Sequence, residues 1–235
     1  MRAASESMTL YSLNVRSGVI LILMWFATSV LTPNASASEQ LDNTADHYVA
    51  GQHYTVLETP VATAPSAAVE VVEVFSYMCI HCYTFDPMLS SWYAEQSDNV
   101  DFVRLPAVFN QAWQLLAQAY YTGQSLGVSE KMHEPLFKAV QVERLDLSDE
   151  DVMAELFQRH AGIEPDTFKK VFKAFSVKSR VMQARGKSRT YGITGVPTMV
   201  VNGKYRVDGN SAGSNAAMLK VVDFLVAKEQ AAVTD

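Results

Sequence analysis

The sequence is poor in cysteine: only two occur among its 235 residues, Cys79 and Cys82. A small secreted protein that depends on disulfides for stability usually spreads several cysteines along its length. A bond between two positions this close closes a very short loop, which in the chain-entropy model stabilises the folded state little. We therefore interpret the pair as a reactive centre and not as a structural crosslink.

The sequence also lacks any cluster of positive charge. Its 19 Lys and Arg residues are scattered, and 25 Asp and Glu residues bring the formal net charge to -6. Proteins that bind nucleic acids usually concentrate basic residues on one face, so we exclude that class of partner. Internal repeats and low-complexity linkers are absent too, and the hydrophobic content of 49% is enough for a substantial buried core.

No apolar segment reaches the roughly 20 residues that a membrane-spanning helix needs. The most apolar one, residues 19–31, follows a start that contains two arginines and precedes small residues at positions 35–37. This order is typical of a secretory signal peptide. We predict that residues 1–37 are a cleaved signal peptide, with Met8 as an alternative start and an uncleaved membrane anchor as the alternative interpretation.

The apolar pattern that follows predicts a strand, a helix and a second strand. Residues 69–75 are rich in valine and too few for a helix, which indicates a central strand. A helical segment follows over residues 79–95 and a second strand over 100–105, while residues 54–57 suggest a short strand before them. The two cysteines therefore lie where the central strand gives way to the helix.

From about residue 110 to residue 190 the apolar pattern is helical throughout. Ser148, with an acidic residue three positions later, is predicted to cap one helix. Gly162 is predicted to end that helix and Pro165 to open the next one. We interpret the methionine and aromatic residues of this block as core and not as a cofactor site.

The end of the chain returns to strands. Residues 197–201 and 205–207 are predicted to form a hairpin around the turn Asn202-Gly203, and a helix over 216–228 follows. The order of elements predicts an α/β fold with an all-helical block inserted between its halves. The predicted domains are a first part over residues 38–108, an inserted helical domain over 109–190 and a second part over 191–235.

The position of the cysteines at a helix start indicates their chemistry. They lie one turn apart, close enough to form and break a bond. The unpaired N–H groups and partial positive charge of the helix N-terminus favour a thiolate at Cys79, and in such settings a thiol pKa falls from about 8.5 to about 3.5–7.5. We predict that Cys79 exchanges with substrate and that the buried Cys82 resolves the mixed disulfide. His81 is predicted to stabilise the thiolate; the alternative is an ordinary surface histidine.

Two segments resemble signatures of the DsbA family of periplasmic thiol:disulfide interchange proteins, which belongs to the thioredoxin superfamily. Residues 75–83 are similar to its active-site segment, and residues 195–205, which begin Gly-Val-Pro-Thr, are similar to its second signature. A lone Cys-x-x-Cys pair also occurs in metal sites, so the two signatures together carry the resemblance. It implies a thioredoxin-like fold with an inserted all-helical domain.

The resemblance also implies roles for individual residues. The Val196–Pro197 peptide is expected to be cis and, with Ile80, to face the substrate. Glu73 is expected to be the buried acid that exchanges a proton with the inner cysteine; the alternative is a paired structural glutamate or one at a solvated strand edge. Ile80 stands where the best-known members carry proline, a departure that leaves the net direction of electron flow open.

The resemblance implies an enzyme, a thiol:disulfide oxidoreductase that introduces disulfides into secreted or periplasmic proteins. Its expected partners are reduced substrate proteins and a DsbB-like membrane quinone reductase for reoxidation, and we expect a periplasmic monomer without a cofactor. A disulfide reductase or isomerase and a chaperone-like peptide binder are alternatives. A copper or zinc site using both cysteines and a histidine, His81 or His133, is a further alternative, although structural zinc usually has four protein ligands.

Overall fold

The computed structural model describes residues 48–64, 66 and 68–234. The predicted signal peptide, residues 1–37, and the first residues of the predicted mature chain lie outside this part of the protein. Among the helices of the described part, none combines the length and the apolar character that crossing a bilayer requires.

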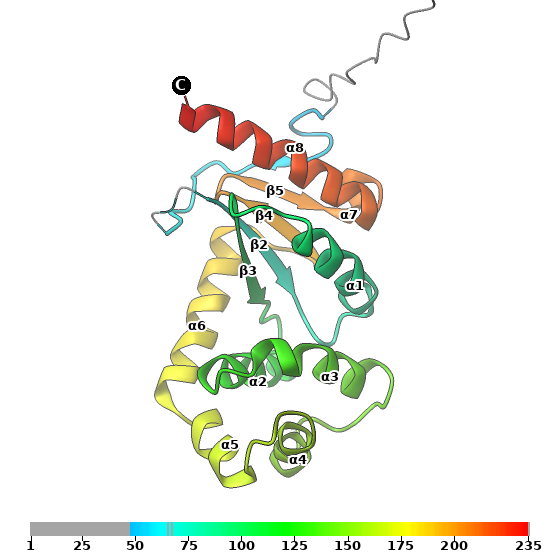
Figure 1. The fold of residues 1–235 in the computed structure, drawn as a ribbon, viewed down its shortest axis with the longest axis vertical. Helices are drawn as coiled ribbons and strands as arrows, with labels where there is room; N and C mark the ends of the chain where they lie inside the picture. The colour runs from blue at the N-terminus through cyan, green and yellow to red at the C-terminus, as the bar shows by residue number, and fades with distance from the viewer. Residues whose placement is uncertain (1–47, 65, 67, 235) are drawn as a thin grey trace, which may run out of the picture. The chain divides into compact units, whose positions relative to one another are not determined.

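A five-stranded mixed sheet carries the fold (Figure 1). In spatial order its strands are β1 (Thr55–Val56), β5 (Tyr205–Asp208), β4 (Thr198–Val201), β2 (Val69–Phe75) and β3 (Val100–Pro106). β3 runs parallel to β2, whereas β4 runs antiparallel to β2, β5 to β4, and β1 to β5. Every residue of β2 is buried, which explains why this strand is a valine-rich run and not an alternation of polar and apolar residues.

Three helices belong to the same part of the fold as the sheet: α1 (Ile80–Ala94), α7 (Gly209–Ala212) and α8 (Asn215–Thr234). α1 and α8 pack on one face, where Phe85 and Val222 share a core with Val71 of β2. The next residues of β2 point the other way, so Val72 and Val74 enter a second core that the inserted helices share. The central strand is therefore covered on both faces.

Between β3 and β4 the chain forms five helices, which we call the helical insertion: α2 (Gln111–Ser125), α3 (Ser129–Gln141), α4 (Glu150–Ala161), α5 (Pro165–Phe172) and α6 (Phe175–Thr190). Its aromatic residues are core, as predicted: Phe137, Phe157 and Phe168 are almost completely buried. α6 returns to the sheet alongside β3 (Figure 1). The α/β fold with an inserted helical block is confirmed, while the exact domain boundaries at residues 109 and 190 stay predictions.

One predicted helix cap is wrong. The N-cap of α4 is Asp149, whose carboxylate accepts a backbone N–H of the first turn at 2.8 Å. Ser148 instead donates its hydroxyl to the Asp146 carboxylate at 2.6 Å. Serine and aspartate cap helices about equally well, so the sequence does not choose between adjacent candidates. The predicted end of this helix is confirmed, because Gly162 adopts the left-handed conformation with a φ of 72°.

The predicted hairpin between β4 and β5 is also confirmed. Asn202 and Gly203 both have positive φ, 48° and 60°, as a two-residue type I′ turn requires. Gly203 has a second constraint, because its carbonyl accepts the Val61 N–H at 2.8 Å and a Cβ on it would collide with the Val61 carbonyl oxygen. The hairpin aligns β4 with β2 and so brings the residues that precede β4 to the start of α1.

Candidate active site

Cys79 and Cys82 lie at the junction of β2 and α1. Cys79 is the N-cap of α1, with an extended backbone (φ -92°, ψ 113°), and its sulfur accepts the backbone N–H of Cys82 at 3.3 Å. The sulfur thus takes the place of the Ser or Asp oxygen that usually satisfies a free N–H group of the first turn. Cys79 is partly exposed, Cys82 is completely buried, and both are free thiols.

The two sulfurs differ strongly in proton affinity. A hydrogen bond with the Cys82 thiol, helped by the backbone N–H groups of Cys82 and His81 and by the charge of His81, lowers the pKa of Cys79 to about 6 against the opposing effect of partial burial. Burial, reinforced by the hydrogen bond and charge of Cys79, raises the pKa of Cys82 far above its usual range. At neutral pH the site therefore holds an accessible thiolate beside a buried thiol.

The segment before β4 lies against the cysteines. The Val196–Pro197 peptide is cis, as the resemblance implies. The Val196 carbonyl oxygen lies 3.3 Å from the Cys79 sulfur, across 117 positions of sequence, and accepts a hydrogen bond from it when Cys79 is protonated. An open cleft of about 480 Å³ begins here. Its walls are His81, residues 194–198 and several residues of β5, α7 and the start of α8: Arg206, Asp208, Gly209, Asn210 and Asn215.

Three side chains next to Cys79 in the sequence are exposed. His81 is exposed, and within the described part its imidazole makes no hydrogen bond with the Cys79 sulfur, so its influence comes through its backbone N–H and its charge. Met78 and Ile80, on either side of Cys79, are 44% and 50% exposed. Large apolar side chains at this exposure surround the reactive sulfur with a surface that a peptide can cover.

Glu73 is completely buried in the middle of β2. The parallel register pairs it with Arg104 of β3, and the Arg104 Nε atom lies 3.3 Å from its Oε2 atom. Within the described part, however, neither carboxyl oxygen of Glu73 receives a well-aligned hydrogen bond. Burial therefore outweighs the attraction of Arg104, and with the repulsion of Asp86 and Cys79 it raises the pKa of Glu73 to about 8.

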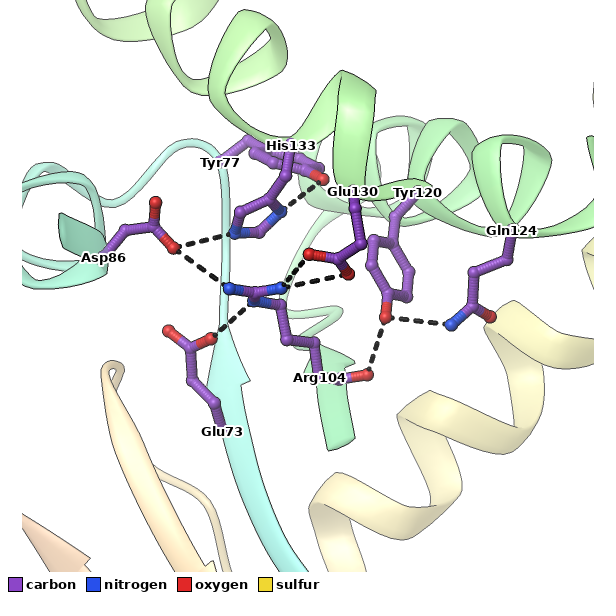
Figure 2. Close-up of polar contacts among 8 residues, drawn as sticks. All are labelled: Glu73, Tyr77, Asp86, Arg104, Tyr120, Gln124, Glu130 and His133. Atoms are coloured by element: carbon purple, nitrogen blue, oxygen red, sulfur yellow. Dashed lines mark hydrogen bonds and ion pairs between the residues drawn. The ribbon is translucent and has the colours of Figure 1, made fainter. Parts of the chain in front are cut away.

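We call the group of side chains around Arg104 the charged cluster (Figure 2). Its members are Arg104, Glu73, Asp86, Glu130 and His133. Besides Glu73, the Arg104 guanidinium lies 3.5 Å from Asp86 of α1 and donates two hydrogen bonds, of 2.9 and 3.1 Å, to Glu130 of α3. His133 of α3 links Asp86, at 3.0 Å from its Nε2 atom, with the Tyr77 hydroxyl, at 3.0 Å from its Nδ1 atom. The charged cluster thus connects four segments of the chain around the buried Glu73.

Most of the charged cluster is not predicted from the sequence. Asp86 follows Cys82 by four positions on α1, so helical spacing was a signal that placed it on the same side of the helix. Arg104 is a charge between the apolar residues Val103 and Leu105 of the predicted strand, which is a second usable signal. Glu130 and His133 gave none, because helix periodicity does not show which surface residue faces a neighbouring strand.

The sequence suggests for His133 only the role of a possible metal ligand beside the cysteines. In the structure both of its ring nitrogens are engaged, by Tyr77 and Asp86. Within the described residues no group of three or more His, Cys, Asp or Glu side chains is arranged to hold a metal ion. The geometry therefore gives the metal-site alternative no support.

Known proteins share both the sequence and the fold. A family model described as a DSBA-like thioredoxin domain matches residues 102–217. The thiol:disulfide interchange protein DsbA of Pseudomonas aeruginosa is 40% identical over 188 residues, which cover 80% of this chain and 89% of that protein. Its counterpart in Pseudomonas syringae pv. tomato is 38% identical over 206 residues, covering 88% and 92%. A crystal structure of Pseudomonas aeruginosa DsbA matches with a TM-score of 0.77 at 39% identity, covering 81% of this chain and 99% of that one.

Proposed function

Because this chain belongs to the DsbA family of thiol:disulfide interchange proteins, we propose that its Cys79–Cys82 pair introduces disulfide bonds into reduced substrate proteins. Membership makes it a thiol:disulfide oxidoreductase on a thioredoxin-like fold with a helical insertion. The net direction of electron transfer and the roles of the individual residues are what we propose. One observation carries it: Cys79 is a helix N-cap with a lowered pKa, and its neighbour Cys82 is a buried thiol.

The proposed reaction begins with the pair oxidised. A substrate thiolate attacks the Cys79 sulfur, a mixed disulfide forms, and the Cys82 sulfur leaves with the bonding electrons. Glu73, which is protonated at neutral pH because its pKa is about 8, supplies the proton that Cys82 takes up. A second substrate thiolate attacks the substrate sulfur of the mixed disulfide, and Cys79 leaves as a thiolate. Two electrons have then passed from the substrate dithiol to the enzyme.

The lowered pKa of Cys79 supports net oxidation of the substrate. The helix N-terminus stabilises the thiolate of the reduced enzyme, whereas the disulfide form carries no charge there to stabilise. The exchange equilibrium is thereby shifted toward reduced enzyme and oxidised substrate. A reductase would have to pass electrons from this stabilised reduced form to its substrate, against this preference.

Substrate docking is proposed at the exposed surface around Cys79. An extended segment of substrate lies along the cis Val196–Pro197 peptide and pairs with its backbone as an added strand would. The half-exposed side chains of Met78 and Ile80 cover apolar groups of the substrate on the other side. Because this contact relies on backbone and general apolar surface, it suits substrates of varied sequence.

The proposed setting is the periplasm, which the chain reaches by means of the predicted signal peptide over residues 1–37. There the reduced pair transfers its electrons to a DsbB-like membrane quinone reductase. In that step the Cys82 thiol must lose its proton to attack a mixed disulfide on Cys79, and Glu73 accepts this proton when it is ionised, which is its minor form at neutral pH because its pKa is about 8. The same carboxyl group thus serves both halves of the cycle.

Two assays on the purified protein test the proposal: oxidation of a dithiol peptide by the disulfide form, and reduction of insulin by the dithiol form, both referred to the equilibrium with glutathione. We expect fast peptide oxidation, slow insulin reduction and an equilibrium that favours the reduced enzyme. Cys79→Ser should abolish both activities, Cys82→Ser should trap substrate on Cys79, and Glu155→Gln, at an exposed position of α4, serves as control. Fast reduction without oxidation would favour the reductase alternative, and no exchange in either direction would contradict the proposal.

A further inference from the structure

The charged cluster is assembled from two parts of the chain. Glu73, Arg104 and Asp86 come from β2, β3 and α1, which belong to the same part of the fold as the cysteines. Glu130 and His133 come from α3 of the helical insertion and point toward the same arginine and aspartate (Figure 2). The insertion therefore reaches the environment of Glu73 through Glu130 and His133.

Three carboxylates compete for the single guanidinium of Arg104. Glu130 has the best contacts, two hydrogen bonds of 2.9 and 3.1 Å to Nη1, although its side chain is 80% exposed. Asp86 lies 3.5 Å from Nη2, and Glu73 lies 3.3 Å from Nε without an aligned hydrogen bond. Because charge-assisted hydrogen bonds are the strong part of such contacts, Glu130 takes a share of Arg104 that would otherwise be directed at Glu73.

His133 controls the second competitor. It is buried between α1 and the loop before it, and burial lowers its pKa, so the ring is neutral at neutral pH. A neutral ring that contacts a carboxylate at Nε2 donates there and accepts the Tyr77 hydroxyl at Nδ1. Although burial opposes it, this hydrogen bond, with the charge of Arg104, lowers the pKa of Asp86. His133 thus keeps Asp86 anionic and fixed in place.

The charged cluster has access to water that Glu73 lacks. An open cleft of about 540 Å³ lies between α1 and α3, and it is lined by members of the charged cluster and their neighbours, Tyr83, Thr84, Asp86, Pro87, Ser90, Arg104, Glu130, His133, Glu134 and Phe137. Glu73 is 0% exposed and does not line it. Solvent and the side chains of α3 therefore act directly on Asp86 and Arg104. They act on Glu73 only through these two residues.

We propose that α3 of the helical insertion sets the proton affinity of Glu73: Glu130 shares the charge of Arg104, and His133 fixes Asp86 beside the same arginine. Both are positioning residues, since neither contacts a reacting sulfur. The inference rests on the proposed role of Glu73 as proton carrier. The titratable or charged groups that interact electrostatically with Glu73 are Cys79, Cys82, Asp86, Arg104, Tyr77 and Tyr120; on β4 the residue opposite Glu73 is Met199, which carries no charge.

The first test replaces Glu130 by glutamine. With one negative charge removed, more of the Arg104 charge acts on Glu73, so the pKa of Glu73 should fall by about 0.5 to 1 pH unit. The readout is a pH titration of the protonated carboxyl band in the infrared spectrum of the disulfide form, assigned by its loss in Glu73→Gln. Glu134→Gln is the matched control, because this residue lies on the same helix and lines the same cleft but pairs with Lys138 at 2.6 Å. An equal shift in both variants, or none in Glu130→Gln, would overturn the role of Glu130.

The second test replaces His133. In His133→Leu the Asp86 carboxylate has only Arg104 left as partner, so it draws the guanidinium away from Glu73 and the pKa of Glu73 should rise. His133→Gln keeps an N–H donor for Asp86 and should restore the value of the original protein. Shifts of opposite sign in the Glu130 and His133 variants are not expected from a general loosening of the fold. An unchanged titration in His133→Leu would refute the role of His133.

A kinetic measurement separates this inference from the proposed function. Glu130→Gln should displace the pH profile of peptide oxidation to lower pH, and the displacement should disappear in the Glu73→Gln background. A displacement that persists there would mean that Glu130 acts on Cys79 directly, which contradicts the inference. If Glu73→Gln itself leaves the pH profile unaltered, the proposed role of Glu73 fails, and the infrared titration still decides whether α3 sets its proton affinity.

Discussion

Replacing Glu73 by glutamine should raise the free energy of unfolding above that of the original protein, and this difference should grow as the pH rises. The glutamate is completely buried in β2, and its pKa is raised from 4.5 to about 8, chiefly by burial. Glutamine has nearly the same shape and stays neutral at every pH. Because the protonated acid is also neutral, Arg104 keeps Asp86 and Glu130 as partners in both proteins near neutral pH.

The sign and size of the effect follow from proton linkage. A group with a raised pKa in the folded state contributes its full stability below the unfolded pKa, near 4.5, and loses that stability as the pH rises through the folded pKa, near 8. Each pH unit between those values is worth about 1.4 kcal/mol. Glu73→Gln should therefore match the original protein near pH 4.5 and exceed its free energy of unfolding by about 3 kcal/mol at pH 7 and about 5 kcal/mol above pH 8.

Urea unfolding at a series of pH values, followed by circular dichroism, measures this difference. The protein should be in the disulfide form, because neither cysteine then titrates. Burial, which is the main cause of the raised pKa of Glu73, is still present in that form. Glu70→Gln is the control, since Glu70 is also a glutamate of β2 but its carboxylate lies 3.3 Å from Lys187. Its removal should give no gain at high pH.

The reasoning would be refuted if the difference in free energy of unfolding between Glu73→Gln and the original protein did not change with pH. Such a result would mean that Glu73 has the same pKa in the folded and unfolded states. A loss of stability at high pH would show that the ion pair with Arg104 outweighs burial. In that case Glu73 would be ionised at neutral pH and would serve as a structural anion.

Two further outcomes are expected. Alkylation of the reduced protein by iodoacetamide should follow a thiolate with a midpoint near pH 6 at Cys79, with no reaction at the buried Cys82, and a midpoint near the ordinary thiol value of about 8.5 would contradict the capping argument. Gly203→Ala should destabilise the fold by more than about 2 kcal/mol in thermal unfolding, because a Cβ there meets the Val61 backbone at a positive φ. Gly186→Ala, in α6 where the added methyl meets nothing within 4 Å, should instead stabilise by about 0.5 to 1 kcal/mol, and equal effects at the two sites would refute the steric explanation.

The redox centre was predictable because its signals are local. A valine-rich strand, a helix start and two cysteines one turn apart lie within 16 consecutive residues, 69–84, and neighbouring positions on a helix have a fixed geometry. The Asn202-Gly203 turn was predictable for the same reason, since few residues tolerate two successive positive φ values. The capping choice between Ser148 and Asp149 was not, because neighbouring candidates differ little in energy.

The sequence by itself determined which residues carry the chemistry, because thiolate formation at a helix N-terminus depends on a few adjacent positions. Only the tertiary structure decided what surrounds them. The parallel register of β2 and β3 places Glu73 opposite Arg104, and the packing of α3 against α1 brings Glu130 and His133 to the same charges. Strand register and helix packing depend on contacts summed over the whole core, so no local pattern in the chain contains them.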